Sequence, residues 1–451
     1  MSADAIHKPL GWFGVFRLGL VQAALGAIVI LMTSTLNRVM VVELALPAML
    51  PGALVGWHYA VQMSRPRWGY GADMGGARTP WIVGGMMVLG VGAVLAALST
   101  ALMAGAVVSG VIAALVSFFL IGVGVGAAGT NLLALLAMRV APARKAAAAA
   151  IVWIMMIFGF VLTAGVAGQM LEPFSLTRLI MVTGIVSSVA VVATCLAVWR
   201  IEPRVAASPP AAKLTPQQKV PFRQAFGEIW NERQARRFTI FVFVSMLAYS
   251  AQDLILEPFA GLIYGYSPGD STKLAGIQNG GVLIGMIVTA IVGTTIGKSR
   301  AGFMRLWTMG GCIASATALG ALALGALVGT SWPLKLNVFA LGVSNGAFAV
   351  AAIGSMMTLA SVGRKSREGT RMGLWGAAQA ISFGLGGFLG AAAIDVARTF
   401  FMDVSSAFAI VFAFEGGAFL AAACLAARVG RTDADNLKLP VMPAGEHLPA
   451  E

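Results

Sequence analysis

The chain has 451 residues, of which 58% are hydrophobic and only 11% are charged, and its formal net charge is +13. A soluble domain carries about 25% charged residues, so this composition excludes a soluble protein and predicts a polytopic membrane protein. The positive charge does not indicate nucleic-acid binding, because the lysines and arginines lie in short loops between apolar segments. The cysteines are isolated within apolar segments, so neither a disulfide framework nor a zinc site is expected.

Twelve apolar segments follow one another along the chain, each long enough, at about 20 residues, to cross the hydrocarbon core. We therefore predict an all-α membrane fold of twelve transmembrane helices, arranged as two six-helix bundles that face each other across a central cleft. The first six helices are expected at about 13–35, 44–64, 80–101, 108–138, 147–171 and 178–199. The last six are expected at about 237–262, 274–297, 302–329, 334–361, 372–396 and 405–428.

Composition divides the chain into four parts. They are an N-terminal six-helix bundle over 1–200, a cytoplasmic linker over 201–236, a C-terminal six-helix bundle over 237–430 and a flexible tail over 431–451. The linker is polar and contains several prolines, and the tail is polar as well. Lysine and arginine are concentrated in the loops that follow even-numbered helices, so both termini and the linker are expected in the cytoplasm.

The two bundles repeat one another in sequence. Gly122 and Gly126 in the fourth segment match Gly342 and Gly346 in the tenth, and both pairs are separated by 220 residues. Basic pairs and helix-opening arginines repeat at the same offset. A constant offset over this distance indicates a duplicated six-helix unit.

The loop after the second helix is a candidate gating loop, because it is dense in arginine and glycine. Its members are Arg65, Arg67, Gly69, Asp73, Gly76 and Arg78. The glycines allow a tight turn, and the aspartate can accept hydrogen bonds at a neighbouring helix start or pair with an arginine. Thr79 and Pro80 are then expected as N-cap and first residue of the third helix. The spacing resembles the loop between helices 2 and 3 of major facilitator transporters, with Ala77 inserted before the arginine. The alternative is a tight turn with a few basic anchors.

Polar side chains in the first and seventh helices form a candidate cleft cluster, since polar groups inside a membrane are costly. Its members are Asn37, Arg38, Glu43, Gln252, Asp253 and Glu257. Asp253 and Glu257 are four residues apart, so they share one helical face. We expect Arg38 to pair with Asp253 or Glu257 across the cleft. Such a pair is either a structural lock between the halves or a contact to substrate.

The tetrapeptide Leu-Glu-Pro-Phe occurs twice, at 171–174 and at 256–259. Proline frees a backbone carbonyl and ends or kinks a helix. The preceding glutamate can satisfy local donors or bind a ligand. The alternative roles of these two sites are therefore to end or kink a helix and to bind a ligand.

His58 is a histidine inside an apolar segment, with Trp57 and Tyr59 beside it. A neutral imidazole nitrogen can ligate a metal, including the magnesium of a chlorophyll, and the two aromatic side chains would then cover the pigment ring. The alternative is a core histidine that is hydrogen-bonded to a carbonyl.

Two stretches carry a more specific resemblance. Residues 36–44, Leu-Asn-Arg-Val-Met-Val-Val-Glu-Leu, resemble the end of helix 1 in the PucC/LhaA family, and residues 252–259, Gln-Asp-Leu-Ile-Leu-Glu-Pro-Phe, resemble its helix 7 signature. This family is the bacteriochlorophyll-delivery branch of the major facilitator superfamily, and the likeness extends over about residues 14–428. The loop after helix 2 looks like the subgroup sometimes labelled bacteriochlorophyll synthase 44.5 kDa chain.

The resemblance implies a multi-pass protein of a bacterial inner, or intracytoplasmic, membrane that handles bacteriochlorophyll or a late precursor and assists assembly of photosynthetic complexes. Its implied partners are that pigment, light-harvesting or reaction-centre polypeptides, bacteriochlorophyll synthase and membrane lipid. Bacteriochlorophyll is also the expected cofactor, and no other metal is expected.

We expect no enzymatic activity. Prenyl transfer needs clustered aspartates that hold magnesium and a diphosphate, whereas Asp253 and Glu257 are the only close acidic pair within a predicted helix. The alternative function is a proton-coupled secondary transporter of a small amphipathic molecule, with Asp253 and Glu257 as the proton carriers.

Overall fold

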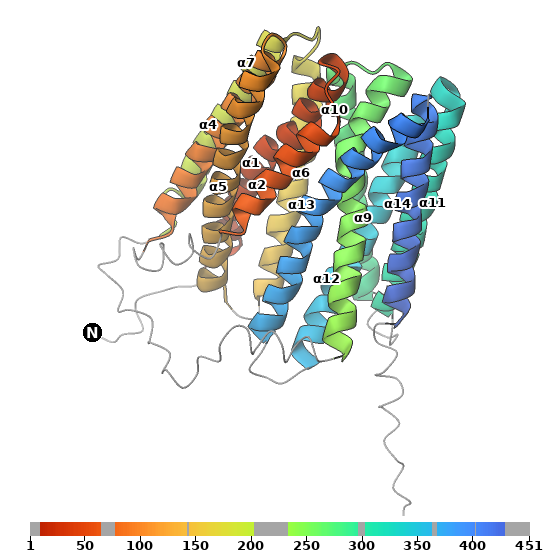
Figure 1. Cartoon of the computed structure of the whole chain (residues 1–451). Helices are drawn as coiled ribbons and strands as arrows, with labels where there is room; N and C mark the ends of the chain where they lie inside the picture. Colours follow the sequence, from red (N-terminus) through yellow and green to blue (C-terminus); the bar gives the residue numbers. More distant parts are fainter. Residues whose placement is uncertain are drawn as a thin grey trace, which may run out of the picture.

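The fold is a bundle of long helices, shown in Figure 1 by a computed structural model that describes residues 10–64, 77–141, 144–202, 233–295, 303–362, 368–401 and 403–428. The first half comprises α1 (Trp12–Ile30), the π-helical segments η2 (Leu31–Leu36) and η3 (Val39–Glu43), α2 (Met49–Gln62), α4 (Thr79–Met103), α5 (Val107–Arg139), α6 (Lys145–Met170) and α7 (Leu176–Val198). The second half comprises α9 (Arg233–Tyr264), α10 (Pro268–Thr295), α11 (Phe303–Val328), the short η7 (Gly329–Ser331), α12 (Leu334–Val362), α13 (Glu368–Phe400) and α14 (Val404–Arg428).

The predicted all-α membrane class is confirmed within these ranges, which contain helices and no strand. Eleven helices are long and apolar enough to cross a membrane, counting α1 with its π-helical extension as one. The exception is α2, which has 14 residues and is therefore about 21 Å long. It begins at Met49 and not near residue 44, because the chain turns at Ala45, where φ is 49°.

Each half has its own apolar core. The core of the first half is built from side chains such as Leu18, Leu89 and Phe118, and the core of the second from side chains such as Phe259 and Phe348. The halves meet where α6 packs along α10 and where α2 packs along α13. The protein is thus two helical units joined along two helix pairs, and the two units stand side by side in Figure 1.

The sequence repeat has a structural counterpart in how the two units pack. A Cβ atom on Gly122 of α5 would lie 2.7 Å from the carbonyl oxygen of His58 in α2. A Cβ atom on Gly342 of α12 would collide with the carbonyl oxygen of Gln278 in α10. His58 and Gln278 are themselves 220 residues apart. The α2–α5 and α10–α12 contacts are therefore equivalent, and in both a glycine lets two backbones approach closely.

The end of the bundle where α1 and α9 begin and α7 ends is here named the linker end. Two side chains cap helices there. The Nε of Arg17 donates to the carbonyl of Ala197 at 2.8 Å, close to the end of α7, and the carboxylate of Glu202 accepts from the backbone N–H groups of Arg78 and Thr79 at 3.0 and 2.7 Å. The prediction of Thr79 as N-cap is wrong, because Arg78 is the N-cap residue and Glu202 supplies the acceptor.

Gly342→Ala is expected to lower the free energy of unfolding by about 1–3 kcal/mol, because the added methyl group forces the backbones of α10 and α12 apart. The measurement is the thermal unfolding midpoint of the detergent-solubilised chain. Gly320→Ala in α11 is the matched control, since nothing lies within 4 Å of its Cβ position. The control is expected to be neutral or slightly stabilising. Equal midpoints for the two variants would contradict the packing described above.

Candidate functional site

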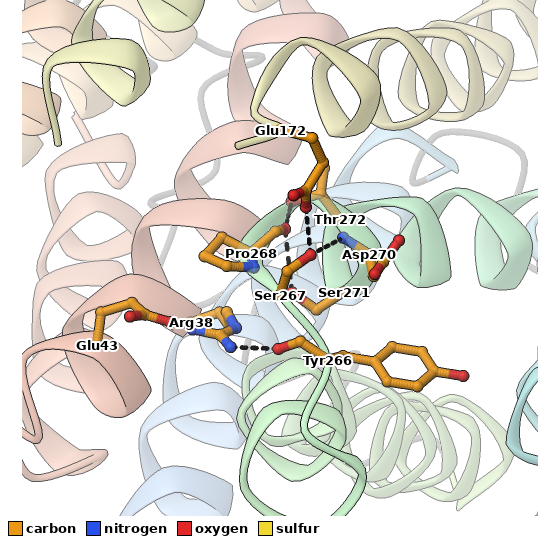
Figure 2. Close-up of polar contacts among 9 residues, drawn as sticks. All are labelled: Arg38, Glu43, Glu172, Tyr266, Ser267, Pro268, Asp270, Ser271 and Thr272. Carbon is orange, nitrogen blue, oxygen red and sulfur yellow. Dashed lines mark hydrogen bonds and ion pairs between the residues drawn. The ribbon is translucent and has the colours of Figure 1, made fainter. Parts of the chain in front are cut away.

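The described hydrogen bonds that join the two halves gather at the end of the bundle opposite the linker end, where the chain turns from α9 into α10. Figure 2 shows this region. We name one group of residues there the clasp: Arg38, Glu43, Glu172, Tyr266 and Ser267. The first three belong to the first half and the last two to the second half, so the clasp holds the halves together at this end, the clasp end.

Arg38 is the central residue of the clasp and is only 2% exposed. One terminal nitrogen forms an ion pair with Glu43, and the other donates to the backbone carbonyl of Tyr266 (Figure 2). The predicted pairing of Arg38 with Asp253 or Glu257 is therefore wrong: the carboxylate partner lies on its own helix, and the partner across the halves is a carbonyl. Arg38 does join the two halves, as the structural-lock alternative required.

Glu172 makes the second polar contact of the clasp. The hydroxyl of Ser267 donates to its carboxylate and accepts from the backbone N–H of Asp270 at 3.1 Å, so Ser267 also caps the start of α10 (Figure 2). The backbones are close here, because a Cβ atom on Gly168 would lie 2.7 Å from the carbonyl oxygen of Gly269. Glu172 thus lies just after the end of α6 in the first half and also binds Ser267 in the second half.

The second Leu-Glu-Pro-Phe tetrapeptide lies inside α9, where Pro258 has no N–H to donate to the carbonyl of Leu254 one turn earlier. The side-chain Nδ2 of Asn37, from the first half, donates to that carbonyl at 2.6 Å. Asn37 is 1% exposed, so water does not compete for this bond. A helix defect in one half is therefore satisfied by a side chain of the other half.

The π-helical turns of the first helix place these side chains. Asn37 and Arg38 lie between η2 and η3, and π-helical turns shift the register of the residues that follow them. Thr35 in η2 also crosses the join, with its hydroxyl 2.9 Å from that of Thr272 in α10. The unusual helix geometry thus coincides with the residues that contact the second half.

The predicted cleft cluster divides into two groups. Glu257 is 2% exposed and lies near Arg38, Ser34 and Ser271 without pairing with Arg38. Asp253 lies one turn nearer the linker end and is partly exposed. Gln252 is fully buried, and both polar atoms of its side chain lack a hydrogen-bond partner among the described residues. Only Asn37, Arg38, Glu43 and Glu257 gather at the clasp end.

His58 is 1% exposed and lies inside the first half. Its Nδ1 is 3.3 Å from the carbonyl oxygen of Val55, and its Nε2 is 2.7 Å from the side-chain nitrogen of Gln62. Both ring nitrogens therefore have protein neighbours within hydrogen-bond distance. This geometry favours the alternative of a hydrogen-bonded core histidine, and the residues present do not fit a magnesium ligand.

Trp57 and Tyr59 point away from one another. Trp57 is 42% exposed and, with Phe119 and Leu115, lines an outward-facing apolar groove of about 450 Å³. The ring of Tyr59 lies 4.5 Å from that of His58 and 5.9 Å from that of Phe383 in the second half. The rings of His58 and Tyr59 are thus in contact, whereas the groove that Trp57 lines includes neither of them.

The candidate gating loop lies largely outside the described residues, which include only Arg78 of its six members. Arg65, Arg67, Gly69, Asp73 and Gly76 are not described. One terminal nitrogen of Arg78 donates to the side-chain oxygen of Asn131 in α5 at 3.2 Å. Arg78 therefore joins the start of α4 to α5, within the first half.

Asp395 of α13 is a further site residue, outside the candidates predicted from the sequence. Its carboxylate accepts from the backbone N–H groups of Ala48 and Met49 at 3.0 and 2.6 Å, so a residue of the second half caps α2 in the first half. A signal was present in the sequence, because Asp395 is the only acidic residue in the predicted segment 372–396.

Comparison with known proteins identifies the family. A family model described as PUCC protein matches residues 35–434. The chain belongs to the PucC family. A relative from Rhodobacter capsulatus named "Bacteriochlorophyll synthase 44.5 kDa chain" is 50% identical over 438 residues, which cover 97% of this chain and 100% of the relative. "Protein PucC" of Rhodovulum sulfidophilum is 27% identical, with 90% of each chain covered.

Solved structures show which fold the PucC-family chain shares. A peptide transporter POT in complex with alafosfalin has a TM-score of 0.72 at 15% identity and covers 96% of this chain and 99% of its own. The nucleoside transporter NupG has a TM-score of 0.65 at 14% identity, with 93% and 100% covered. At these identities the likeness shows the fold alone, which is the major facilitator fold.

Asn37→Ala is expected to lower the free energy of unfolding by about 1–3 kcal/mol, because the buried Leu254 carbonyl loses its donor. Pro258→Ala restores an N–H that can donate to that carbonyl within α9. The double variant is therefore expected to be more stable than Asn37→Ala alone, as measured by denaturant unfolding in detergent.

Asn279→Ala is the control for this pair, because the Asn279 side chain donates at 2.9 Å to Ala275 in its own helix. Its loss is expected to be smaller and to be unaffected by Pro258→Ala. A loss from Asn37→Ala that stays the same in the Pro258→Ala background would show that the two residues are not coupled.

Proposed function

We propose that this PucC-family chain binds bacteriochlorophyll, or a late precursor of it, and helps to deliver it to light-harvesting or reaction-centre polypeptides. The observation that carries the proposal is the full-length, 50% identity to a protein whose name refers to bacteriochlorophyll synthesis. The relatives named PucC add to it, since they extend over most of both chains. The proposed role is carriage and assembly, without catalysis.

The architecture supports a role in carriage. A two-unit helical fold can bind a molecule between the units and release it when they separate at one end. In this chain the clasp end is held closed by Arg38 on Tyr266 and by Glu172 on Ser267. Release toward that end would require these bonds to break. We further propose that the chain lies in a bacterial inner membrane with both termini in the cytoplasm, an orientation that its loop charges favour.

The proposal is tested in the organism's own photosynthetic membrane. A strain lacking the chain is expected to lose near-infrared absorption from its light-harvesting or reaction-centre complexes, and the wild-type chain to restore it. Arg38→Ala is expected to restore less, because it opens the clasp. Arg428→Ala at the linker end is the control, since Arg428 is exposed at the end of α14. Unchanged absorption in the deletion strain would contradict the proposal.

Binding is tested separately by gentle purification of the chain from the native membrane. A near-infrared absorption band that co-purifies with it is expected if the chain binds the pigment itself. If the preparation is colourless but the deletion strain loses its complexes, the chain assists assembly without binding the pigment itself.

A proton-coupled transporter of a small amphipathic molecule is the second candidate. It is favoured by Glu257, which is buried in α9 and has a carboxylate oxygen without a hydrogen-bond partner among the described residues. Such a group can exchange a proton during transport. In reconstituted vesicles a pH gradient would then drive uptake of chlorophyllide by the wild-type chain but not by Glu257→Gln. Equal uptake with and without the gradient would exclude this candidate.

A further inference from the structure

A second set of buried polar groups lies inside the second half, apart from the clasp. Glu415 of α14 is 4% exposed, and neither of its carboxylate oxygens has a hydrogen-bond partner among the described residues. Gln252 of α9 is 0% exposed, and its amide nitrogen and oxygen are unpartnered within the same ranges. Polar groups that are buried in this way are unfavourable unless something pairs with them.

Helix geometry places Gln252 and Glu415 at a similar depth along α9 and α14. The rings of Phe259 in α9 and Phe408 in α14 are in contact, with centroids 5.2 Å apart. Gln252 lies seven residues before Phe259, and Glu415 lies seven residues after Phe408. Seven residues are about two helical turns, so each polar residue shares the face of its phenylalanine. The helices α9 and α14 lie side by side and run in opposite directions (Figure 1). Moving back seven residues in α9 and forward seven residues in α14 therefore leads toward the linker end in both helices.

Asp253 adds a second carboxylate to this region. Asp253 lies within electrostatic range of Glu415 and also of Tyr249. Asp253 is partly exposed, so the group extends from the buried residues Gln252 and Glu415 to the surface of the second half. The group therefore offers two carboxylates and an amide oxygen, all of them oxygen ligands.

Among the described residues, no basic side chain forms an ion pair with Asp253 or Glu415. The sequence contains no lysine or arginine from 238 to 264 in α9 or from 404 to 427 in α14. Among the described side chains of the packed helices α11 and α13, the basic residues lie near the helix ends. The other titratable groups nearby are Tyr249 and Glu257 in α9 and Tyr59 in α2, which lies near Tyr249; the basic residue Arg38 lies near Glu257, toward the clasp end. Arg38 is already paired with Glu43, so a positive charge at this site must come from outside the protein.

We propose that Glu415, Asp253 and Gln252 bind a small monovalent cation, a proton or a sodium ion, inside the second half. Carboxylate and amide oxygens are the ligands that hard cations prefer, and a carboxylate also accepts a proton. The site lies within one half, so binding does not require the clasp to open. It is also independent of which molecule the chain carries, and the test below does not involve a pigment.

The test measures thermal unfolding of the purified full-length chain at constant ionic strength and pH 8, with choline chloride replaced by sodium chloride. Sodium at 100 times its Kd favours the folded state by about 100-fold. The unfolding midpoint of the wild-type chain is therefore expected to rise, and that of Glu415→Gln to stay unchanged. Asp270→Asn is the control that should respond like wild type, because Asp270 is exposed and pairs with Lys273.

If sodium has no effect on the wild-type chain, a second arm tests the proton. In sodium-free buffer, lowering the pH from 8 to 6 is then expected to raise the midpoint of the wild-type chain and of Asp270→Asn relative to Glu415→Gln, because the folded site takes up the proton. Asp253→Asn replaces Glu415→Gln if that variant does not fold. Equal responses of the wild-type chain and the site variant in both arms overturn the proposal.

Discussion

Backbone groups of each half take hydrogen-bond partners from the side chains of the other half, and the join between the two halves depends on these bonds. Asn37 donates to the carbonyl of Leu254, and Arg38 donates to the carbonyl of Tyr266. In the reverse direction, Asp395 of the second half accepts from the first N–H groups of α2. Each of these bonds pairs a side chain of one half with the main chain of the other.

The two halves repeat one another in packing but have diverged at the join. The glycines at 122 and 342 make the same kind of contact in their own halves. The tetrapeptide Leu-Glu-Pro-Phe, by contrast, follows the end of a helix at 171–174 and lies inside α9 at 256–259. Its first copy provides a carboxylate for the clasp. The proline of its second copy leaves the carbonyl of Leu254, one turn earlier, without a donor in its own helix, and Asn37 supplies that donor. The same four residues thus contribute different chemistry according to the helix that holds them.

The order and approximate extent of the helices could be predicted from sequence, because the length of an apolar segment is directly visible in it. The polar residues of the first and seventh helices could also be singled out, since charges inside apolar segments are costly. The partner of Arg38 could not be predicted. Glu43 reaches it through π-helical turns, which have no evident sequence signal here.

Partners that are distant in sequence were missed for a related reason. Asp395 and Glu202 each cap a helix far away in the chain, and only the packing of the bundle brings them there. The prediction of a pigment site around His58 rested on three consecutive residues. Consecutive residues of a helix point in directions about 100° apart, so Trp57 and Tyr59, two residues apart, lie on nearly opposite sides of α2.

The cap on α2 links the folding of one helix to the position of another. The first turn of this short helix takes acceptors for two of its N–H groups from Asp395, on the opposite unit. If the two units move apart at this end, those amides lose their acceptors and become accessible to water. Fraying of the first turn of α2 is therefore coupled to separation of the two units. The helical length of α2 depends on whether the units are in contact at this end.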